Sequence, residues 1–270
     1  MFTKIQKSKI SKISKISKIY CLAVVFLMLF SFPSFLTATH SWGEYHWARI
    51  LNPFTLKMGD NLSSTWKPYL TTTSSDWSLS TVLDTTIVTG KTTGQRCRPT
   101  LGRVEVCNYK YGNKGWLGIA QIWANGTHIT QGTVKVNDTY FNTATYNTTA
   151  WRNLVMCQEI GHVFGLDHQD EVQTNPNLGT CMDYTSNPVG PPSNEHPNQH
   201  DYDQLLVIYG HLDASTTISQ KSPAVMGQLS FDDQRNWGKK VRQSRNGLTA
   251  LYELDFGGGH KVFTHVLWAY

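Results

Sequence analysis

Four residues with short, regular spacing could together hold a metal ion and activate a water molecule. The segment CQEIGHVFGLDH, residues 157–168, carries Gln158, Glu159, His162 and His168. On a helix, Gln158 and His162 are four residues apart and project from the same face, with Glu159 beside them. Two side chains so placed can bind one metal ion while the neighbouring carboxylate holds a water molecule bound to it. The spacing therefore predicts a metal site suited to hydrolysis.

The third ligand must reach the metal from outside the helix. Gly165 can adopt a positive φ angle, so the chain can leave the helix and return within three residues, where His168 stands. With three protein ligands and one open position, zinc lowers the pKa of its bound water to about 7. Glu159 would then accept the proton as hydroxide attacks a carbonyl. We expect Zn²⁺ as the cofactor, Gln158, His162 and His168 around it, and Glu159 as the general base.

A buried helix is needed to position these side chains. Asn147, Thr148 and Thr149 can supply its N-cap, Trp151 begins an apolar stripe, and Gly165 provides a stop. Apolar residues are spread around the whole circumference, so the helix should be buried on most sides. Buried Gln, Glu and His side chains then need polar partners.

A second helix and several strands are expected around this segment. Asn198 and Asp201 resemble a capping pair at the start of a helix that ends at Gly210. The turn signal Asn125-Gly126 separates two of the expected strands. Runs of β-forming residues predict strands at residues 82–89, 103–109, 118–124 and 128–137, and two more in the tail, GLTALYELDF and KVFTHVLWAY. Residues 41–80 show weak periodicity and support no assignment.

The segment E-I-G-H-V-F-G-L-D-H, from Glu159 to His168, resembles the zinc-binding motif of the metzincin endopeptidases, nearest in layout to the matrixin-like branch. Cys181-Met182-Asp183-Tyr184 resembles the Met-turn that lies under the metal in that clan. The resemblance is firmest over residues 151–184. It implies an α/β (α+β) fold, with a twisted mixed sheet packed on the zinc-site helix and a loop-rich lower half that carries the Met-turn and a final helix.

The resemblance also implies roles outside the motif helix. Tyr184 follows Met182 by two residues, as in metzincins whose tyrosine moves onto the metal or the transition-state oxyanion, so we expect a catalytic role for it, with simple packing as the alternative. The strand at residues 118–120 resembles the edge strand that pairs with an extended substrate. The implied partner is a protein or peptide bound as an extended strand. Residues 208–210 resemble the end of the last helix of a matrixin domain.

Gln158 departs from the metzincin pattern, which has a histidine at this position. An amide oxygen is neutral, whereas zinc in proteins is held by thiolate, imidazole or carboxylate. Three outcomes follow: Gln158 ligates weakly in a working enzyme, another histidine supplies the missing ligand, or the site has lost zinc and the protein binds without catalysis. The conceivable substitutes are His128, His196 and His200. Each could instead be a surface histidine or one whose hydrogen bonds are made within the protein. His260 and His265 are interpreted as structural.

The first 39 residues read as a secretory signal. Six lysines and no acid occupy the first twenty residues, and an apolar run follows before Pro33 and Ala38. Without these six, 18 basic residues face 19 acidic ones, so the remainder is near −1 and no basic nucleic-acid surface is indicated. A membrane contact is expected only through an uncleaved leader, which is the alternative to cleavage. The predicted location is secreted and extracellular.

Four cysteines remain after the leader, an even number in an exported chain. They allow three pairings, of which we favour Cys97 with Cys107 and Cys157 with Cys181. The second pair would join the motif helix to the segment that holds Met182. Buried free thiols are the alternative.

The sequence thus predicts a leader at 1–39, a metzincin-like metallopeptidase domain at 40–213 and a β-rich extension at 214–270. The extension could complete the main domain or form a small appendage. The predicted function is that of a secreted, monomeric zinc endopeptidase that hydrolyses peptide bonds through a metal-activated water molecule. The alternative is a non-catalytic binding protein of metzincin fold whose zinc site is lost or weakened.

Overall fold

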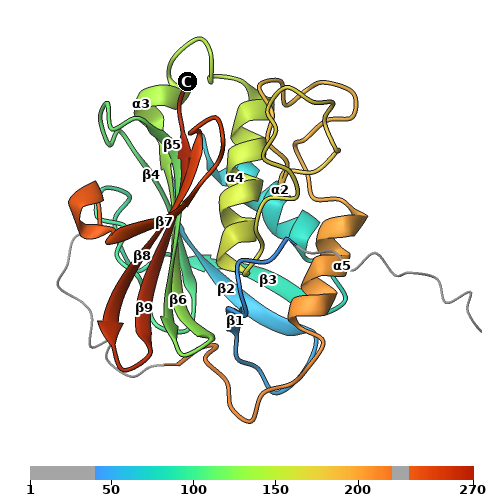
Figure 1. Cartoon of the computed structure of the whole chain (residues 1–270), viewed down its shortest axis with the longest axis vertical. Coiled ribbons are helices and arrows are strands. Elements are labelled where there is room, and N and C mark those ends of the chain that lie inside the picture. Colours follow the sequence, from blue (N-terminus) through green and yellow to red (C-terminus); the bar gives the residue numbers. More distant parts are fainter. Residues whose placement is uncertain (1–39, 221–230) are drawn as a thin grey trace, which may run out of the picture. The chain divides into compact units, whose positions relative to one another are not determined.

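A large mixed sheet is the scaffold of the computed structural model, which describes residues 40–220 and 231–270 (Figure 1). The strands are β1 His46–Trp47, β2 Phe54–Asn61, β3 Leu83–Thr89, β4 Val104–Tyr109, β5 Trp116–Asn125, β6 His128–Asn137, β7 Lys239–Gln243, β8 Thr249–Gly257 and β9 His260–Trp268. The α-helices are α2 Lys67–Trp77, α3 Asp138–Phe141, α4 Thr149–Val163 and α5 Gln199–Ile208, and a 3₁₀ turn spans Gln234–Asn236.

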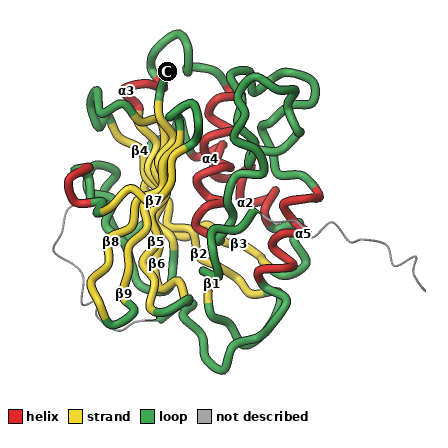
Figure 2. Tube along the Cα trace, in the orientation of Figure 1, coloured by secondary structure: helices red, strands yellow, loops and turns green. Residues whose placement is uncertain are grey.

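The nine strands of the described residues follow the order β3-β2-β4-β6-β5-β9-β8-β7, with β1 paired to β6 outside this path. β2, β3, β4 and β6 pair in parallel, and β5, β9, β8 and β7 continue the sheet in antiparallel pairs. Figure 2 shows α2, α4 and α5 together on one side of the strands. The expected mixed α/β architecture is confirmed at this level.

The strands predicted before the motif helix are confirmed as β3, β4, β5 and β6, and the two predicted in the tail as β8 and β9. β5 and β6 form a hairpin whose turn contains Gly126, at φ +59°. The sequence did not predict strands β1, β2 and β7 or helices α2 and α3. α2 is rich in Ser and Thr, which are modest helix formers, and it is fixed by packing: Leu70 and Trp77 are buried, and Ser74 bonds Thr85 of β3.

Local sequence signals set the ends of the two predicted helices, α4 and α5. The Thr148 hydroxyl accepts a hydrogen bond from the Trp151 amide at the start of α4. Past its end, Gly165 adopts φ +98°, and a Cβ there would lie 2.4 Å from the Tyr45 carbonyl oxygen. Asn198 and Asp201 form the predicted capping box of α5. Both helix predictions are confirmed.

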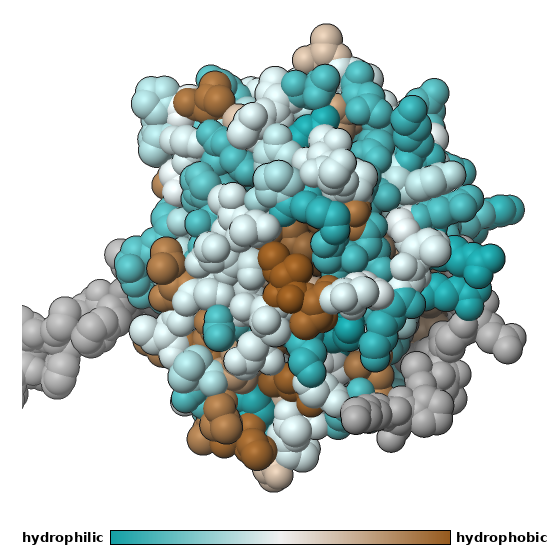
Figure 3. All heavy atoms as spheres, turned by 180° about the vertical axis from the view of Figure 1, so that it is seen from behind, coloured by the Kyte–Doolittle hydropathy of each residue, from teal (hydrophilic) through white to brown (hydrophobic). Residues whose placement is uncertain are grey.

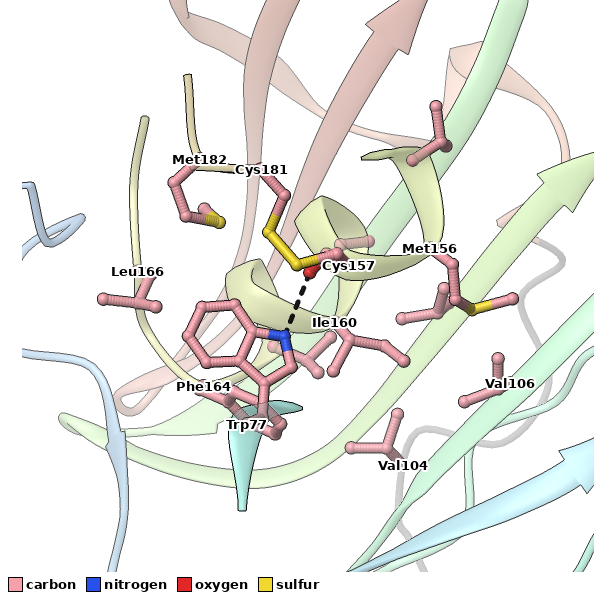
Figure 4. Close-up of a cluster of buried hydrophobic side chains, with 14 of the residues drawn as sticks. Trp77, Val104, Val106, Met156, Cys157, Ile160, Phe164, Leu166, Cys181 and Met182 are labelled. Carbon is pink, nitrogen blue, oxygen red and sulfur yellow. Dashed lines mark hydrogen bonds between the residues drawn. A yellow bond between two sulfur atoms is a disulfide. The ribbon is translucent and has the colours of Figure 1, made fainter. Parts of the chain in front are cut away.

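The core around α4 contains the second disulfide (Figure 4). Cys157 of α4 is bonded to Cys181, and Cys97 is bonded to Cys107, so both favoured pairings are confirmed. The Trp77 indole donates to the Cys157 carbonyl at 3.3 Å. These contacts hold α2, α4 and the segment at Cys181 together.

The tail changes the position of β5 within the sheet. Residues 118–120 were expected at an edge that is free to pair with substrate, but β5 is bonded to β6 on one side and to β9 on the other. The edge expectation is wrong because the tail strands add to the sheet there. The predicted extension therefore continues the main sheet, and the described residues 40–220 and 231–270 belong to one compact unit.

On the face of the molecule opposite to that seen in Figure 1, most of the surface is hydrophilic or of intermediate hydropathy, and hydrophobic side chains gather in smaller separate areas (Figure 3). The predicted leader at 1–39 lies outside the described residues. Within the part of the chain that is described, no helix has the length and apolar character needed to cross a membrane.

Candidate metal centre

Two imidazoles converge at the end of the motif helix. His162 lies in the last turn of α4, and the turn at Gly165 brings His168 back toward it. Their Nε2 atoms are 3.2 Å apart. Two imidazole nitrogens that share a tetrahedral zinc ion at 2.0–2.1 Å are separated by about 3.3 Å. The predicted pair therefore comes together at a spacing that one cation could bridge.

The other ring nitrogen of His162 fixes its protonation. His162 Nδ1 lies 2.9 Å from the Leu166 carbonyl oxygen, which can only accept, so Nδ1 carries the hydrogen and Nε2 keeps its lone pair. Burial, and then the neighbouring His168, lower the pKa of His162 to about 3. The ring is therefore neutral near pH 7, with a ligating nitrogen directed at His168.

His168 is held by the loop that follows the turn. Its amide donates to Asp167 at 2.8 Å, and its Nδ1 lies 3.7 Å from a Glu171 carboxylate oxygen. Arg242 of β7 donates to both carboxylate oxygens of Asp167. Burial alone would raise the pKa of Asp167, but the Arg242 hydrogen bonds keep it below its usual value. The tail thus fixes the loop that positions His168.

Gln158 is buried one turn before His162. Its Nε2 donates to the Cys181 carbonyl at 2.9 Å, while its Oε1 has no hydrogen-bond partner among the described residues. A buried acceptor without a partner is costly unless something else satisfies it. The free amide oxygen is therefore the atom of Gln158 that could face a cation.

Glu159 is 1% exposed and lies against β5. A Cβ on Gly118 would lie 2.3 Å from Glu159 Oε1, so only glycine leaves room for this carboxylate. Neither carboxylate oxygen has a hydrogen-bond partner in the described part of the chain. Burial raises the pKa of Glu159 well above its ordinary value. A carboxylate whose pKa is raised binds a proton more tightly than a solvent-exposed one, which is the direction of shift that favours a general base.

Tyr184 lies beside the histidine pair, and Met182 packs against α4. The Tyr184 ring meets the His168 ring edge-on, with centroids 5.3 Å apart. Met182 packs so closely on α4 that a Cβ at Gly161 would lie 2.5 Å from its sulfur. Gln158 and Tyr184 both line a cavity of about 10 Å³, which is room for about one water molecule.

His265, which the sequence led us to interpret as structural, belongs to this centre. It projects from β9, its ring stacks on His162 at 3.9 Å between centroids, and its centroid is 5.8 Å from that of His168. It is 2% exposed, and neither ring nitrogen has a hydrogen-bond partner among the described residues. The only sequence signal was a histidine inside an apolar strand, where a polar side chain needs a partner.

The histidines considered as substitute ligands lie in other clusters. His128 Nε2 is 3.2 Å from Asp213, His196 Nδ1 is 2.7 Å from Asp76, and His200 stacks on His40. Grouped side chains that could hold a metal occur at three places in the described residues, one being Asp167, His168 and Glu171.

No protein-family model and no curated protein sequence matches the chain. The assignment of function therefore depends on the geometry of this centre.

Proposed function

We propose that the protein is a zinc-dependent endopeptidase that hydrolyses peptide bonds with water. The observation that carries the proposal is the 3.2 Å approach of His162 Nε2 and His168 Nε2, with the tautomer of His162 fixed by the Leu166 carbonyl. Without a cation, the two neutral rings can make one hydrogen bond, with His168 Nε2–H donating to the lone pair of His162 Nε2, whereas a cation would bind both nitrogens. The orphaned Gln158 Oε1 is a third donor that a cation would satisfy.

The residues present fit a zinc ion in two of three positions. His162 and His168 are ordinary zinc ligands, and the Gln158 amide oxygen would complete a weaker set. When bound, zinc acidifies water and polarises a carbonyl group. Glu159 takes the proton of the attacking water and returns it to the leaving amine. Tyr184, edge-on to His168, donates a hydrogen bond to the oxygen of the reacting carbonyl.

The described conformation is closed, which makes it a latent form under this proposal. β9 occupies the side of β5 that an extended substrate would pair with, and His265 covers His162. A cavity of about 620 Å³ beside His168, bordered by the 169–174 loop and by Arg245, is the open approach from solvent. Peptide access to Glu159 requires the tail strands to move.

The latency can be tested at the contact between the tail and the ligand loop. Arg242→Ala removes the tie between β7 and Asp167, and we expect the cleavage rate to rise by up to about 5-fold, because a partly exposed ion pair contributes up to ~1 kcal/mol. Lys240→Ala, on the same exposed strand, is the matched control. An Arg242→Ala rate equal to that of the control would remove this part of the proposal.

The function itself is tested by zinc content and cleavage. The mature protein should contain zinc and should cleave casein or gelatin. Cleavage should stop when a chelator is added. Glu159→Gln should retain the zinc and lose the activity, whereas Glu44→Gln, an exposed carboxylate, should retain both. Equal cleavage rates for wild type and Glu159→Gln would refute the proposed peptidase activity.

A non-catalytic binding protein is the second candidate, favoured by the pairing of β5 on both sides and by His265 over the histidine pair. It predicts no cleavage by either wild type or Arg242→Ala. Bound zinc without cleavage in both proteins would support it.

A further inference from the structure

Five large aliphatic side chains are exposed around the C-terminal end of α5. They are Ile50, Leu51, Leu206, Val207 and Leu212, each 50–57% exposed, and we call them the α5 patch. Residues 50–53 and 206–212 contain no Asp, Glu, Lys or Arg. Single exposed apolar residues are ordinary, but a group of them on one surface marks a contact site. This surface can leave water without the cost of desolvating a charge.

Hydrogen bonds bring the chain segments of the α5 patch together. The Asp213 amide donates to the Arg49 carbonyl at 2.9 Å, and the Asn52 side chain donates to the Tyr209 carbonyl at 2.8 Å. The turn between β1 and β2 therefore lies against the segment that follows α5 (Figure 1). The two charged residues that flank the patch, Arg49 and Asp213, are paired with each other at 2.8 Å.

The described chain begins on the same helix. The His40 amide donates to Gln204 Oε1 at 3.0 Å, and His40 Nε2 lies 3.1 Å from Asp201 Oδ1. Both partners belong to α5, and Gln204 precedes Leu206 of the patch by two residues. The His40 carbonyl also accepts a hydrogen bond from the Asp167 amide at 2.6 Å. The residue that directly follows the leader is therefore fixed to the helix that carries the α5 patch.

The leader sequence is typical of a membrane anchor that leaves the following domain outside. Residues 19–39 are 21 residues without a charged side chain, and a helix that crosses a bilayer needs about 20 predominantly apolar residues. The six lysines before them favour the cytoplasmic side for the N-terminus. The folded domain is then expected on the opposite side, where its two disulfides can form and persist.

The short distance between the leader and α5 limits how the domain can be placed. Leu36 is the last apolar residue of the leader larger than alanine, four positions before His40. An extended chain spans at most about 3.6 Å per residue, so His40 is within about 15 Å of Leu36. The headgroup layer of a bilayer is about 5 to 8 Å thick on each side. An anchored leader therefore holds α5 at the membrane surface.

We propose that, in the chain that retains its leader, the α5 patch rests on the lipid bilayer in which the leader is anchored. Its aliphatic side chains enter the boundary between headgroups and acyl chains, as the apolar face of an interfacial helix does. The contact fixes the orientation of the domain on the membrane. It uses no residue assigned to zinc binding or catalysis, so it does not depend on the proposed peptidase activity.

The test uses the full chain in phosphatidylcholine vesicles that contain lipids with a nitroxide on the acyl chain, which quench a nearby fluorophore. A bimane label is attached at Val207→Cys or, as the matched control, at Val189→Cys, which replaces an exposed valine outside the patch. Both are made with Cys21→Ser, which removes the cysteine outside the two disulfides. We expect quenching at 207 to be at least about 3-fold stronger than at 189, because only the patch reaches the acyl chains.

A second pair of variants tests whether the patch itself makes the contact. Leu51→Ser/Leu212→Ser should reduce the quenching at 207 by about half, because two apolar side chains no longer enter the bilayer. Leu79→Ser/Leu178→Ser, at exposed leucines outside the patch, should leave it unchanged.

Three results would overturn the proposal: equal quenching at 207 and 189, equal effects of the two leucine pairs, or full chain that does not sediment with the vesicles. Unquenched label together with a concentration-dependent dimer in ultracentrifugation would assign the α5 patch to a second copy of the chain instead.

Discussion

Glu159→Gln in the metal-free protein should raise stability at neutral pH while it removes the proposed general base. The carboxylate is buried at 1% exposure, and neither oxygen has a hydrogen-bond partner among the described residues. Leaving a buried polar group unsatisfied costs about 1 to 3 kcal/mol, and more when it is charged. Glutamine has nearly the same shape and cannot ionise. The glutamine amide is also left without partners, so the gain near pH 8 comes from the charge alone and is about 1.4 kcal/mol for each unit by which burial raises the pKa of Glu159, with about 2 to 4 °C in Tm for each kcal/mol.

The gain in stability of Glu159→Gln over wild type should increase as the pH rises. Burial raises the folded-state pKa of Glu159 above 4.5, so between 4.5 and the folded pKa the folded protein holds a proton that the unfolded chain has released. Over that interval this group lowers the free energy of unfolding by up to about 1.4 kcal/mol for each pH unit gained. Its stabilising contribution is complete below pH 4.5 and is lost as the pH rises through the folded pKa. Glu159→Gln lacks this slope.

The assay is urea unfolding of chelated protein from pH 4 to pH 8, for wild type, Glu159→Gln and the exposed control Glu44→Gln. Wild type and the control should lose stability with rising pH relative to Glu159→Gln, and the curves should approach each other near pH 4. Parallel curves for wild type and Glu159→Gln would show that the carboxylate is solvated or paired in solution, and the argument for a poised base would fail.

Three further changes test the same region. Gln158→His should tighten zinc binding at least 10-fold in a chelator competition, because an imidazole replaces a neutral amide; unchanged affinity would mean that this side chain faces away from the metal. Cys157→Ala/Cys181→Ala should cost about 3.5 kcal/mol in denaturant unfolding, against about 2.7 kcal/mol for the pair separated by 10 residues rather than 24; the reverse order would contradict the loop-entropy reasoning. Thr148→Ala should cost about 1 kcal/mol by loss of the N-cap, whereas Thr149→Ala, inside the helix, should cost less; equal costs would remove the cap as the cause.

The sequence predicted the elements whose signals are local. The cap at Thr148, the capping box at Asn198 and the Asn125-Gly126 turn each act within a few residues, so the two helices and the β5–β6 hairpin were found. α2 was missed because its Ser and Thr residues carry weak helix propensity and its stability comes from packing. Tertiary contacts decide such segments.

The candidate site likewise has one part that local sequence signals predict and one part that depends on contacts between distant segments. The His162 and His168 convergence follows from helix spacing and one glycine turn, which the sequence displays. The arrival of His265 depends on β9 pairing with β5, and its partner residue Ala120 is 145 positions away in the chain. No local pattern encodes that pairing. The edge prediction for β5 failed for this reason, since a strand is at an edge only if no distant segment joins it.

Under the proposed function, Gln158 takes the place that a histidine has in the metzincin pattern, and its hydrogen bonds can be compared with those of a histidine. A histidine at position 158 could direct one ring nitrogen to the Cys181 carbonyl and the other to the metal. The amide of Gln158 divides the same two tasks between Nε2, which donates to Cys181, and Oε1, which remains free. The hydrogen bond that joins α4 to the Met182 segment is thus retained, while in the proposed site the ligand atom would be an amide oxygen in place of an imidazole nitrogen. Glutamine in place of histidine at position 158 should therefore weaken metal binding far more than it weakens the fold. Gln158→His should accordingly change zinc affinity with little change in metal-free stability.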